Sequence, residues 1–229
     1  MLLKNRFIIA LLFLFSSSAI AAGMKPQVPV VFIDDENREA TIDVENTDCC
    51  TALLHSSLQT IPEDPVNKLI ITPQLVRVDG GNKQQVRVVL KDGVKLASQT
   101  MQRINFTTVP IDDGKNNRAR VTIGQNIPVI LSPASLPLNT SPWQGLISQR
   151  AGTSLTIKNP TRYVVRLTTQ VDLLPGKTKV ELPKTYILPN ETLTLALPQG
   201  ASYPQTIRLH PVTRFGILTA PYELRLKPR

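Results

Sequence analysis

The sequence RVTIGQNIPVIL, residues Arg120–Leu131, is the stretch that most clearly indicates the fold. Ala119, Val121 and Ile123 alternate with other residues, so in a strand they form an apolar row on one face. Pro128 lacks the amide hydrogen that a central strand uses, which predicts a position at a sheet edge. An apolar edge strand invites aggregation unless another chain completes it, but the pattern also fits an ordinary last strand that covers its own core. The pattern by itself leaves both interpretations open.

Six earlier segments have the same short, strand-like character, and turn-forming strings such as Asp34–Asn37, Asp79–Asn82 and Asp112–Asn117 separate several of them. No segment shows convincing helical periodicity. Seven short strands within about 110 residues predict an immunoglobulin-like β-sandwich. The predicted strands are Val28–Ile33, Ala40–Val44, Thr51–Leu58, Leu69–Ile71, Gln85–Leu90, Arg103–Val109 and Arg120–Leu131.

A second β domain follows this first one. Residues 133–142 carry prolines and small polar residues, which is typical of a linker. Beyond them the predicted strands are Gly152–Lys158, Tyr163–Asp172, Lys184–Leu188, Thr192–Leu197, Thr206–Pro211 and Pro221–Lys227. We therefore predict an all-β chain with a first domain at residues 22–132 and a second at residues 143–229.

Residues 1–21 have the pattern of a secretory signal peptide. Lys4 and Arg6 precede the apolar run Phe7–Phe15, and small residues follow at Ala19 and Ala21. The apolar run is shorter than the roughly 20 residues that a membrane-spanning helix needs, so we expect an exported, soluble protein without membrane insertion. The formal net charge is +9, but export and the scattered positions of the basic residues argue against nucleic acid as a partner.

Cys49 and Cys50 are adjacent and are the only cysteines, which excludes a disulfide framework. Adjacent Cα atoms lie about 3.8 Å apart, below the usual disulfide span of roughly 4.4–6.8 Å. A strained bond between neighbours and two free thiols both remain open. His55 and His210 do not stand at zinc-ligand spacing with them, so we expect no metal site.

The sequence gives no support for a catalytic function. Neither histidine lies in a recognisable catalytic sequence, and no phosphate-binding loop is present. The carboxylate pairs Asp34–Asp35 and Asp112–Asp113 lie in turn-forming strings, where acidic residues are common. We expect neither enzyme activity nor a cofactor.

Several motifs stand in a specific order along the chain: Ile70–Pro73 with Gln85–Val88 after a turn, Arg103–Phe106 running to Val109–Pro110, Leu155–Val165 with its NPTRYVV core, Leu188–Pro189 and Phe215–Gly216. Together they resemble the PapD-like periplasmic chaperones of chaperone–usher pilus pathways, and the resemblance spans nearly the whole mature chain.

The resemblance implies a boomerang of two immunoglobulin-like domains in the periplasm. Such a chaperone folds and stabilises pilus subunits by donor-strand complementation, lending a strand to an incomplete sandwich, and delivers them to an outer-membrane usher. Ala119, Val121 and Ile123 fall at the donor positions, and Ile127 is assigned to the same subunit-binding strand. No cofactor is implied.

One departure from the family concerns the basic residues that hold the subunit's terminal carboxylate. This chain has Pro29 and Pro128 at the two expected positions, and proline cannot bind a carboxylate. Since a partly buried carboxylate needs a charged donor, we expect Arg103 to replace them, with Arg87 as the second choice. The short loop before the donor strand suggests a chaperone of rod or simple pili, and the missing anchors suggest a divergent branch such as the archaic one.

The alternative is an exported structural or adhesive fibre subunit that itself receives strands. Such a subunit needs a free apolar N-terminal extension, and Gly23–Pro29, with its two prolines and Lys25, is a poor one. We also expect that the free chaperone can cover its apolar edge by self-association.

Overall fold

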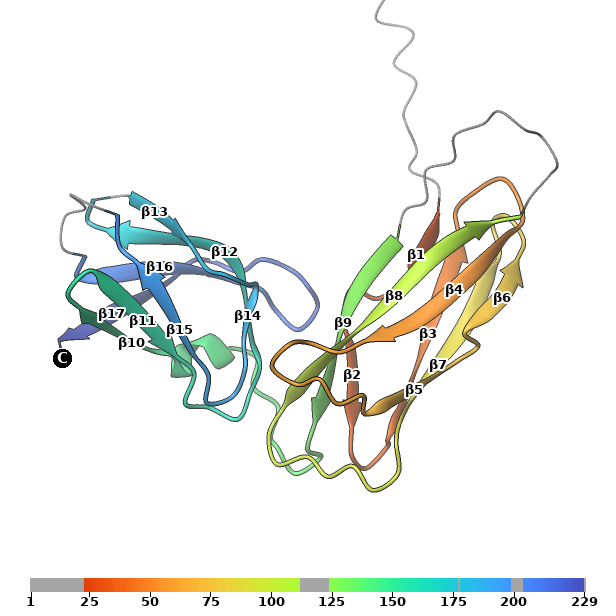
Figure 1. Cartoon of the computed structure of the whole chain (residues 1–229), viewed down its shortest axis with the longest axis horizontal. Coiled ribbons are helices and arrows are strands. Elements are labelled where there is room, and N and C mark those ends of the chain that lie inside the picture. Colours follow the sequence, from red (N-terminus) through yellow and green to blue (C-terminus); the bar gives the residue numbers. More distant parts are fainter. Residues whose placement is uncertain (1–22, 112–123, 177, 199–203, 229) are drawn as a thin grey trace, which may run out of the picture.

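The computed structural model describes residues 23–111, 124–176, 178–198 and 204–228, and it confirms an all-β chain of two sandwich domains (Figure 1). The one helix in these ranges is the short 3-10 turn η2 (Pro142–Gly145), which follows the linker. Nothing helical within the described ranges has the length and apolar character to cross a membrane. The predicted signal peptide lies outside the described residues.

The first domain consists of two facing sheets. The four-stranded sheet has the order β1 (Met24–Pro26), β3 (Glu39–Asn46), β7 (Lys83–Leu90), β5 (Leu69–Thr72). The five-stranded sheet has the order β2 (Val31–Asp34), β9 (Gly124–Ser132), β8 (Thr100–Pro110), β4 (Ala52–Gln59), β6 (Leu75–Val78). Alternate residues of both sheets point inward, so their apolar side chains form one core that includes Ile42, Val86, Ile104, Phe106 and Leu131.

The N-terminal segment changes sheets partway along its length. β1 pairs antiparallel with β3, whereas β2, four residues later, pairs parallel with the end of β9, Val31 opposite Val129. Val28 and Pro29 lie in the crossing between the two short strands and are exposed. Because the N-terminal segment changes sheets here, its strand β2 pairs with only part of β9.

The second domain begins at η2 and builds a separate core. Its strands follow the order β13 (Thr178–Glu181), β12 (Val165–Leu174), β16 (Thr206–Pro211), β17 (Tyr222–Pro228), β10 (Ile147–Ala151), β11 (Ser154–Lys158), β15 (Thr192–Ala196), and β14 (Tyr186–Ile187) pairs with β12. These strands curl around buried side chains that include Trp143, Leu155, Val165, Val171 and Leu209. The domain is therefore a second sandwich with its own hydrophobic core.

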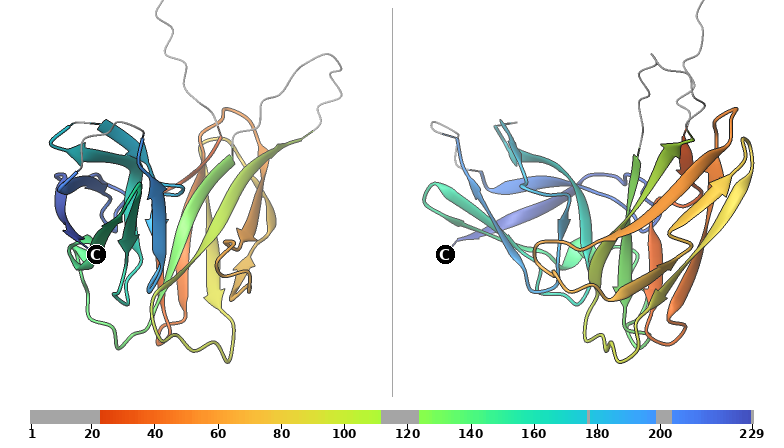
Figure 2. Two further views of the ribbon diagram at one scale, coloured as in Figure 1. Left: turned by 60° about the vertical axis from the view of Figure 1, so that its left-hand side comes forward. Right: turned by 45° about the vertical axis from the view of Figure 1, so that its right-hand side comes forward.

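The two domains meet at an angle, and a third apolar cluster joins them (Figures 1 and 2). Met101 and Ile130, on the outer face of the five-stranded sheet, pack in this cluster with Val164 of the second domain. Hydrogen bonds support the contact: the Gln99 amide donates to the Arg162 carbonyl at 2.8 Å, and the Val164 amide donates to the Gln99 side chain at 2.9 Å. The junction is thus packed and hydrogen-bonded as well as joined by the linker.

The structure adds four strands that the sequence pattern did not predict, β1, β6, β10 and β13, none longer than five residues. β1 lies between Gly23 and a proline-rich stretch, where the sequence suggests no strand. It forms because Met24 fills a core position at 1% exposure and the Met24 amide donates to the Thr108 hydroxyl at 3.1 Å. Tertiary contacts, rather than local propensity, produce this strand.

Candidate functional site

β9 has two halves with different neighbours. Val129–Leu131 pairs with β8 on one side and with β2 on the other, so it lies inside the sheet. Gly124–Pro128 pairs with β8 alone, and among the described residues no strand pairs with its other side. The expectation of an edge strand therefore holds for the first half only. The second half is internal because the crossing of the N-terminal segment brings β2 alongside it.

Side chains of β9 form two rows. Ile127, Val129 and Leu131 point into the core of the first domain, and Ile127 is only 6% exposed. Asn126, Pro128 and Ile130 form the alternate row, in which Ile130 belongs to the junction with the second domain. Ile127, expected to bind a subunit, is thus placed in the chain's own core. The apolar row Ala119, Val121 and Ile123 lies outside the described residues.

Arg103 lies on β8, opposite Pro128 of β9 in the ladder. Its neighbours on β8, Met101 in the junction and Ile104 in the core, show that Arg103 belongs to the row that faces the second domain. Its guanidinium donates to the Asn126 side chain and, at 3.2 Å, to the Asn126 carbonyl. Burial lowers the pKa of Arg103 from its ordinary value, but an arginine stays charged at neutral pH.

Arg166 of β12 brings a second positive charge to the same place from the second domain. Burial, and after it the positive charge of Arg103, lowers the pKa of Arg166, so the two guanidinium groups lie within electrostatic range of each other. The Arg166 side chain donates to the Thr213 carbonyl at 3.3 Å. Within the described part of the chain, neither arginine has an acidic partner within ion-pair distance. Two half-buried cations without an anion form a site that favours a carboxylate.

Tyr186, on β14, is the third polar group beside Arg103 and anchors a network between the domains. Its hydroxyl donates to Glu63 of the first domain at 3.0 Å, and Lys184 makes ion pairs with both Glu63 and Glu191. Burial raises the pKa of Tyr186, and the hydrogen bond to Glu63 raises it further. Burial opposes ionisation of Glu63, but hydrogen bonds from Lys184 and Tyr186 outweigh it and lower the pKa of Glu63. This network joins the second domain to the first beside Arg103.

Arg87, the second-choice anchor, lies elsewhere. It belongs to β7 in the four-stranded sheet and makes an ion pair with Glu39 of the neighbouring β3. The Arg87 side chain is exposed, and its Nε donates to Glu39 at 2.8 Å. The structure therefore brings Arg103 together with Arg166 and leaves Arg87 on a different sheet with its charge already paired.

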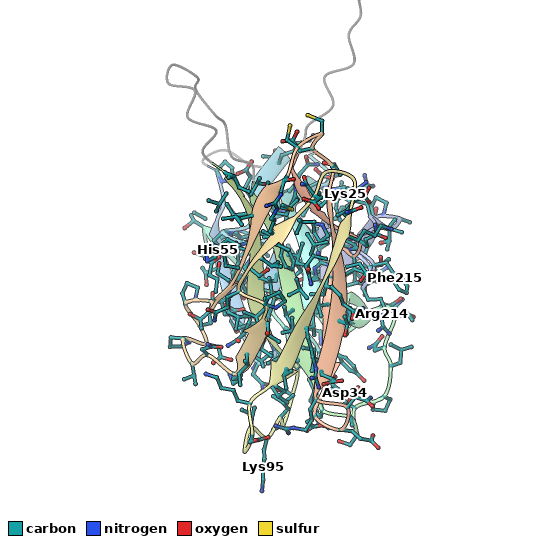
Figure 3. The ribbon with its side chains drawn as sticks, turned by 90° about the vertical axis from the view of Figure 1, so that its right-hand side faces the viewer. Lys25, Asp34, His55, Lys95, Arg214 and Phe215 are labelled. Atoms are coloured by element: carbon teal, nitrogen blue, oxygen red, sulfur yellow. The ribbon has the colours of Figure 1, made fainter. Side chains whose placement is uncertain are left out.

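A loop of the second domain places apolar side chains beside the crossing segment. Phe215, Ile217 and Leu218 are each more than 60% exposed, and the backbone at Gly216 approaches Pro29 so closely that an added Cβ would lie 3.0 Å from the Pro29 side chain. Figure 3 shows Arg214 and Phe215 along the same side of the molecule. The Arg214 guanidinium stacks 4.4 Å from the centre of the Phe32 ring, which ties the base of this loop to the first domain.

Other parts of the described chain offer less for binding chemistry. A cavity of about 280 Å³ lies beneath the linker, lined by residues such as Phe32, Trp143 and Tyr163. The ligand atoms of Asp48, Cys49 and Cys50 lie within 4.8 Å of one another, and they form the one group of potential metal ligands found among the described residues. These three residues are exposed or half-exposed and offer one carboxylate and two thiols, fewer than the four ligands of a structural zinc site.

Arg166 was not among the predicted site residues. It directly follows the Tyr163–Val165 part of the NPTRYVV motif, and since Val165 is buried in the second core, strand alternation turns Arg166 outward. Strand alternation could therefore have predicted that the charge of Arg166 faces outward. It could not have predicted that Arg103, across the domain junction, lies near it.

Comparisons with known proteins agree with this architecture. A family model described as "Pili and flagellar-assembly chaperone, PapD N-terminal domain" matches residues 23–137, and one described as "Pili assembly chaperone PapD, C-terminal domain" matches residues 142–222. The uncharacterized fimbrial chaperone YhcA of Escherichia coli strain K12 is 35% identical over 213 residues, covering 93% of this chain and 94% of that protein. The chaperone protein MrkB of Klebsiella pneumoniae is 23% identical, covering 89% of this chain and 92% of that protein.

Solved structures with the same fold include a chain in the Salmonella enterica SafA pilin complex with the SafB chaperone. Its TM-score is 0.75 at 21% identity, with 91% of this chain and 99% of that chain covered. The E. coli chaperone DraB gives a TM-score of 0.73 at 20% identity, with 90% and 99% covered. These likenesses extend over both domains.

Proposed function

Because the chain belongs to the family of PapD-like pilus-assembly chaperones, we propose that it binds its pilus subunits along the open edge of β9 and anchors them at Arg103. The protein is a periplasmic chaperone of fimbrial subunits and not an enzyme, and membership of this family sets aside the alternative of a structural fibre subunit. The finer points of the proposal concern which residues of this chain hold the subunit.

The open half of β9 carries the proposal. A subunit strand can pair with the free backbone groups of Gly124–Pro128, because that side of the ladder is unused in the described structure. The inward row of β9, Ile127, Val129 and Leu131, fills the chaperone's own core. A strand that continues this alternation upstream directs Val121 and Ile123 to the same side, beyond the sandwich, where a subunit core can receive them.

The apolar row supplies the binding energy. Burying one Val or Ile side chain contributes about 1.5–3 kcal/mol, so Val121 and Ile123 together with main-chain pairing can stabilise an incomplete subunit. Ala119 adds a smaller contact at the start of the row. Ile127 then marks the point where the strand passes from the subunit core to the chaperone core, since it is buried in the latter.

Arg103 and Arg166 supply the anchor for the subunit's terminal carboxylate. Two half-buried guanidinium groups with no acidic partner in the described part of the chain gain a charge-assisted hydrogen bond each when a carboxylate binds, and the carboxylate relieves the repulsion between them. Arg87 lacks this advantage because Glu39 already pairs with it. The two prolines at the usual anchor positions are thereby compensated by one arginine from each domain.

The pathway ends at an outer-membrane usher, as in other chaperones of this family, where the growing fibre takes over the subunit. In the free chaperone, a second copy can cover the same open edge, which would protect it from aggregation. Self-association uses the edge that a subunit occupies in the complex, so the two modes of binding exclude each other.

Co-expression in a periplasm tests the proposal. The chain is expressed with a pilus subunit that is insoluble when expressed alone, and the periplasmic extract is separated by size. We expect a one-to-one complex and a soluble subunit. A subunit that stays aggregated to the same extent with and without the chain contradicts the proposal.

A further inference from the structure

The loop between β3 and β4 carries a pair of thiols that subunit binding does not use. Cys49 and Cys50 are both exposed and unbonded, and their Sγ atoms lie 3.1 Å apart. Each sulfur therefore has the other as a near neighbour while both stay open to reagents. Hydrogen bonds that the Cys49 thiol donates to Cys50 and Asp48 raise the pKa of this thiol.

Buried and half-buried contacts hold this loop in place from both sides. The Asn46 side chain, which is fully buried, donates to the carbonyls of Cys50 and Val78, each at 2.9 Å, and accepts from the Asp48 amide at 3.0 Å. On the other side the loop packs against Gly80, where an added Cβ would lie 2.7 Å from the Asp48 carbonyl oxygen. The backbone around the two cysteines has little room to move without disturbing these contacts.

The same loop is joined to the N-terminal strand. The Thr47 hydroxyl donates to the Gly23 carbonyl at 2.9 Å and accepts from the Gly23 amide at 3.0 Å, and the Thr47 amide donates to the same carbonyl at 2.9 Å. Met24, the next residue, donates its amide to Thr108 of β8. A change in the cysteine loop therefore has a short path through Thr47 to β1 and on to β8, the strand that pairs with β9.

We propose that Cys49 and Cys50 form a reversible disulfide with each other, so that the loop is a redox-modified site of the periplasmic protein. Periplasmic thiols meet an oxidising environment, and once one cysteine has formed a mixed disulfide, the sulfur of its neighbour is close enough to displace it faster than a second molecule can. The proposal is independent of how subunits bind.

The oxidant is a disulfide, either of a thiol–disulfide oxidase or of oxidised glutathione. One cysteine thiolate attacks a sulfur of that disulfide. This step forms a mixed disulfide between the cysteine and the oxidant and releases one thiol of the oxidant. The other cysteine then attacks the mixed disulfide, closes the Cys49–Cys50 bond and releases the second thiol. The chain loses two protons and two electrons, and the oxidant disulfide takes them up as two thiols.

The bond closes a small ring across one peptide unit, which is strained because neighbouring Cα atoms are closer than a disulfide prefers. Strained and exposed disulfides are the labile ones, so the pair is expected to return to thiols in a mildly reducing glutathione buffer. Ring closure must also shift the backbone that packs on Gly80 and Asn46. We expect the shift to weaken the Thr47 contacts to Gly23.

Thiol trapping and intact mass test the bond. The chain is isolated from the periplasm, treated at once with N-ethylmaleimide and weighed. The expected form is a monomer two hydrogen atoms lighter than the mass of the mature sequence, with no maleimide attached, and brief reduction by glutathione then allows two maleimides. Two maleimides on the untreated protein, or disulfide-linked dimers of the unmutated chain, overturn the proposal.

Single variants provide the control. Cys49→Ser and Cys50→Ser each leave one exposed thiol without its neighbour, so each is expected to carry a glutathione adduct or to form a dimer when isolated from the periplasm in the same way, unlike the unmutated chain. A variant that stays fully reduced there overturns the claim that these thiols are oxidised in the periplasm.

Hydrogen exchange tests the link to β1. The amides of Met24 and Lys25 are expected to exchange about threefold faster or more in the oxidised chain than in the Cys49→Ser, Cys50→Ser double variant. Equal exchange rates in the two proteins overturn the coupling between the cysteine loop and the N-terminal strand.

Discussion

The two sheets of the first domain each carry an arginine on their outer face, and the two side chains have different surroundings. Arg87, on the four-stranded sheet, is exposed and makes an ion pair with Glu39 of the adjacent strand. Arg103, on the five-stranded sheet, is half-buried, has no acidic partner among the described residues, and faces Arg166. Since both arise from the same strand alternation, the second domain makes the difference. It covers one sheet and leaves the other in water.

The edges of the two sheets differ in a related way. β5 closes one side of the four-stranded sheet and exposes Ile70 at 52%, a single apolar residue on a four-residue strand. The open half of β9 lies beside the junction with the second domain and continues upstream toward Val121 and Ile123. Isolated apolar residues on short edges are ordinary, whereas a longer edge beside a cationic site that no described acidic residue pairs with is suited to another chain.

The largest expected effect on subunit binding distinguishes the open edge of β9 from the edge at β5. Val121→Asp combined with Ile123→Asp is expected to abolish the subunit complex, because two carboxylates would have to enter an apolar groove in place of two side chains worth about 1.5–3 kcal/mol each. Co-purification of a tagged subunit measures the complex.

Ile70→Asp is the matched control for that pair. It adds one carboxylate at an exposed apolar position of the other sheet, so the complex and the yield of chaperone should both stay unchanged. Loss of the complex in Ile70→Asp, or its survival in the double variant, would show that the wrong edge has been assigned.

The next largest effect on subunit binding distinguishes Arg103 from Arg87. Arg103→Met keeps an unbranched apolar stem but removes the charged guanidinium, and it is expected to weaken subunit binding about 10- to 100-fold, the equivalent of one charged hydrogen bond. Arg87→Met should leave affinity within about twofold, since its exposed pair with Glu39 contributes little. Titration calorimetry or competition between chaperone variants for one subunit gives the ratio, and equal losses in the two variants would contradict the assignment.

A smaller, more specific effect concerns Arg166. If Arg103 and Arg166 hold the same carboxylate, the losses caused by Arg103→Met and Arg166→Met should not add, with an interaction energy of about 0.5–3 kcal/mol in a double-mutant cycle. Additive losses would mean that the two arginines contact different groups. Unfolding midpoints of the three variants check that each chaperone is folded.

The smallest effect is a pH dependence of the domain contact. The pKa of Glu63 is lowered in the folded chain, so its contribution to stability is fully present above its ordinary value of 4.5 and is lost as the pH falls through the lowered value. Between about pH 5 and about pH 3, the free energy of unfolding should therefore fall more for the unmutated chain than for Glu63→Gln. Chemical unfolding at a series of pH values measures it. Parallel pH profiles for both proteins would exclude Glu63 as the titrating group.

Much of the fold was predictable from residue patterns because its longer strands alternate clearly. Ala40–Val44 and Gln85–Leu90 both lie within observed strands, and the turn strings between strands were informative. β1 was not predictable, since Met24 is held by core packing and by a hydrogen bond to a strand 84 residues away. The parallel pairing of β2 with β9 was missed for the same reason, and it made half of the expected edge strand internal.

The site was only partly accessible from the sequence. Alternation along β8 is enough to turn Arg103 outward, but the half-burial and the neighbouring charge come from Arg166, Tyr186 and the angle between two domains. No local pattern encodes that angle. The residues of the donor row, its anchor, the domain boundaries and the archaic branch remain predictions that experiments on the complex must test.

A crystal structure of the chaperone with its pilus subunit tests the central claim most directly. We expect a subunit strand hydrogen-bonded to Gly124–Pro128, with Val121 and Ile123 in the subunit core and the terminal carboxylate within hydrogen-bonding distance of both Arg103 and Arg166. A subunit strand on β5, or a carboxylate bound at Arg87, would contradict the account.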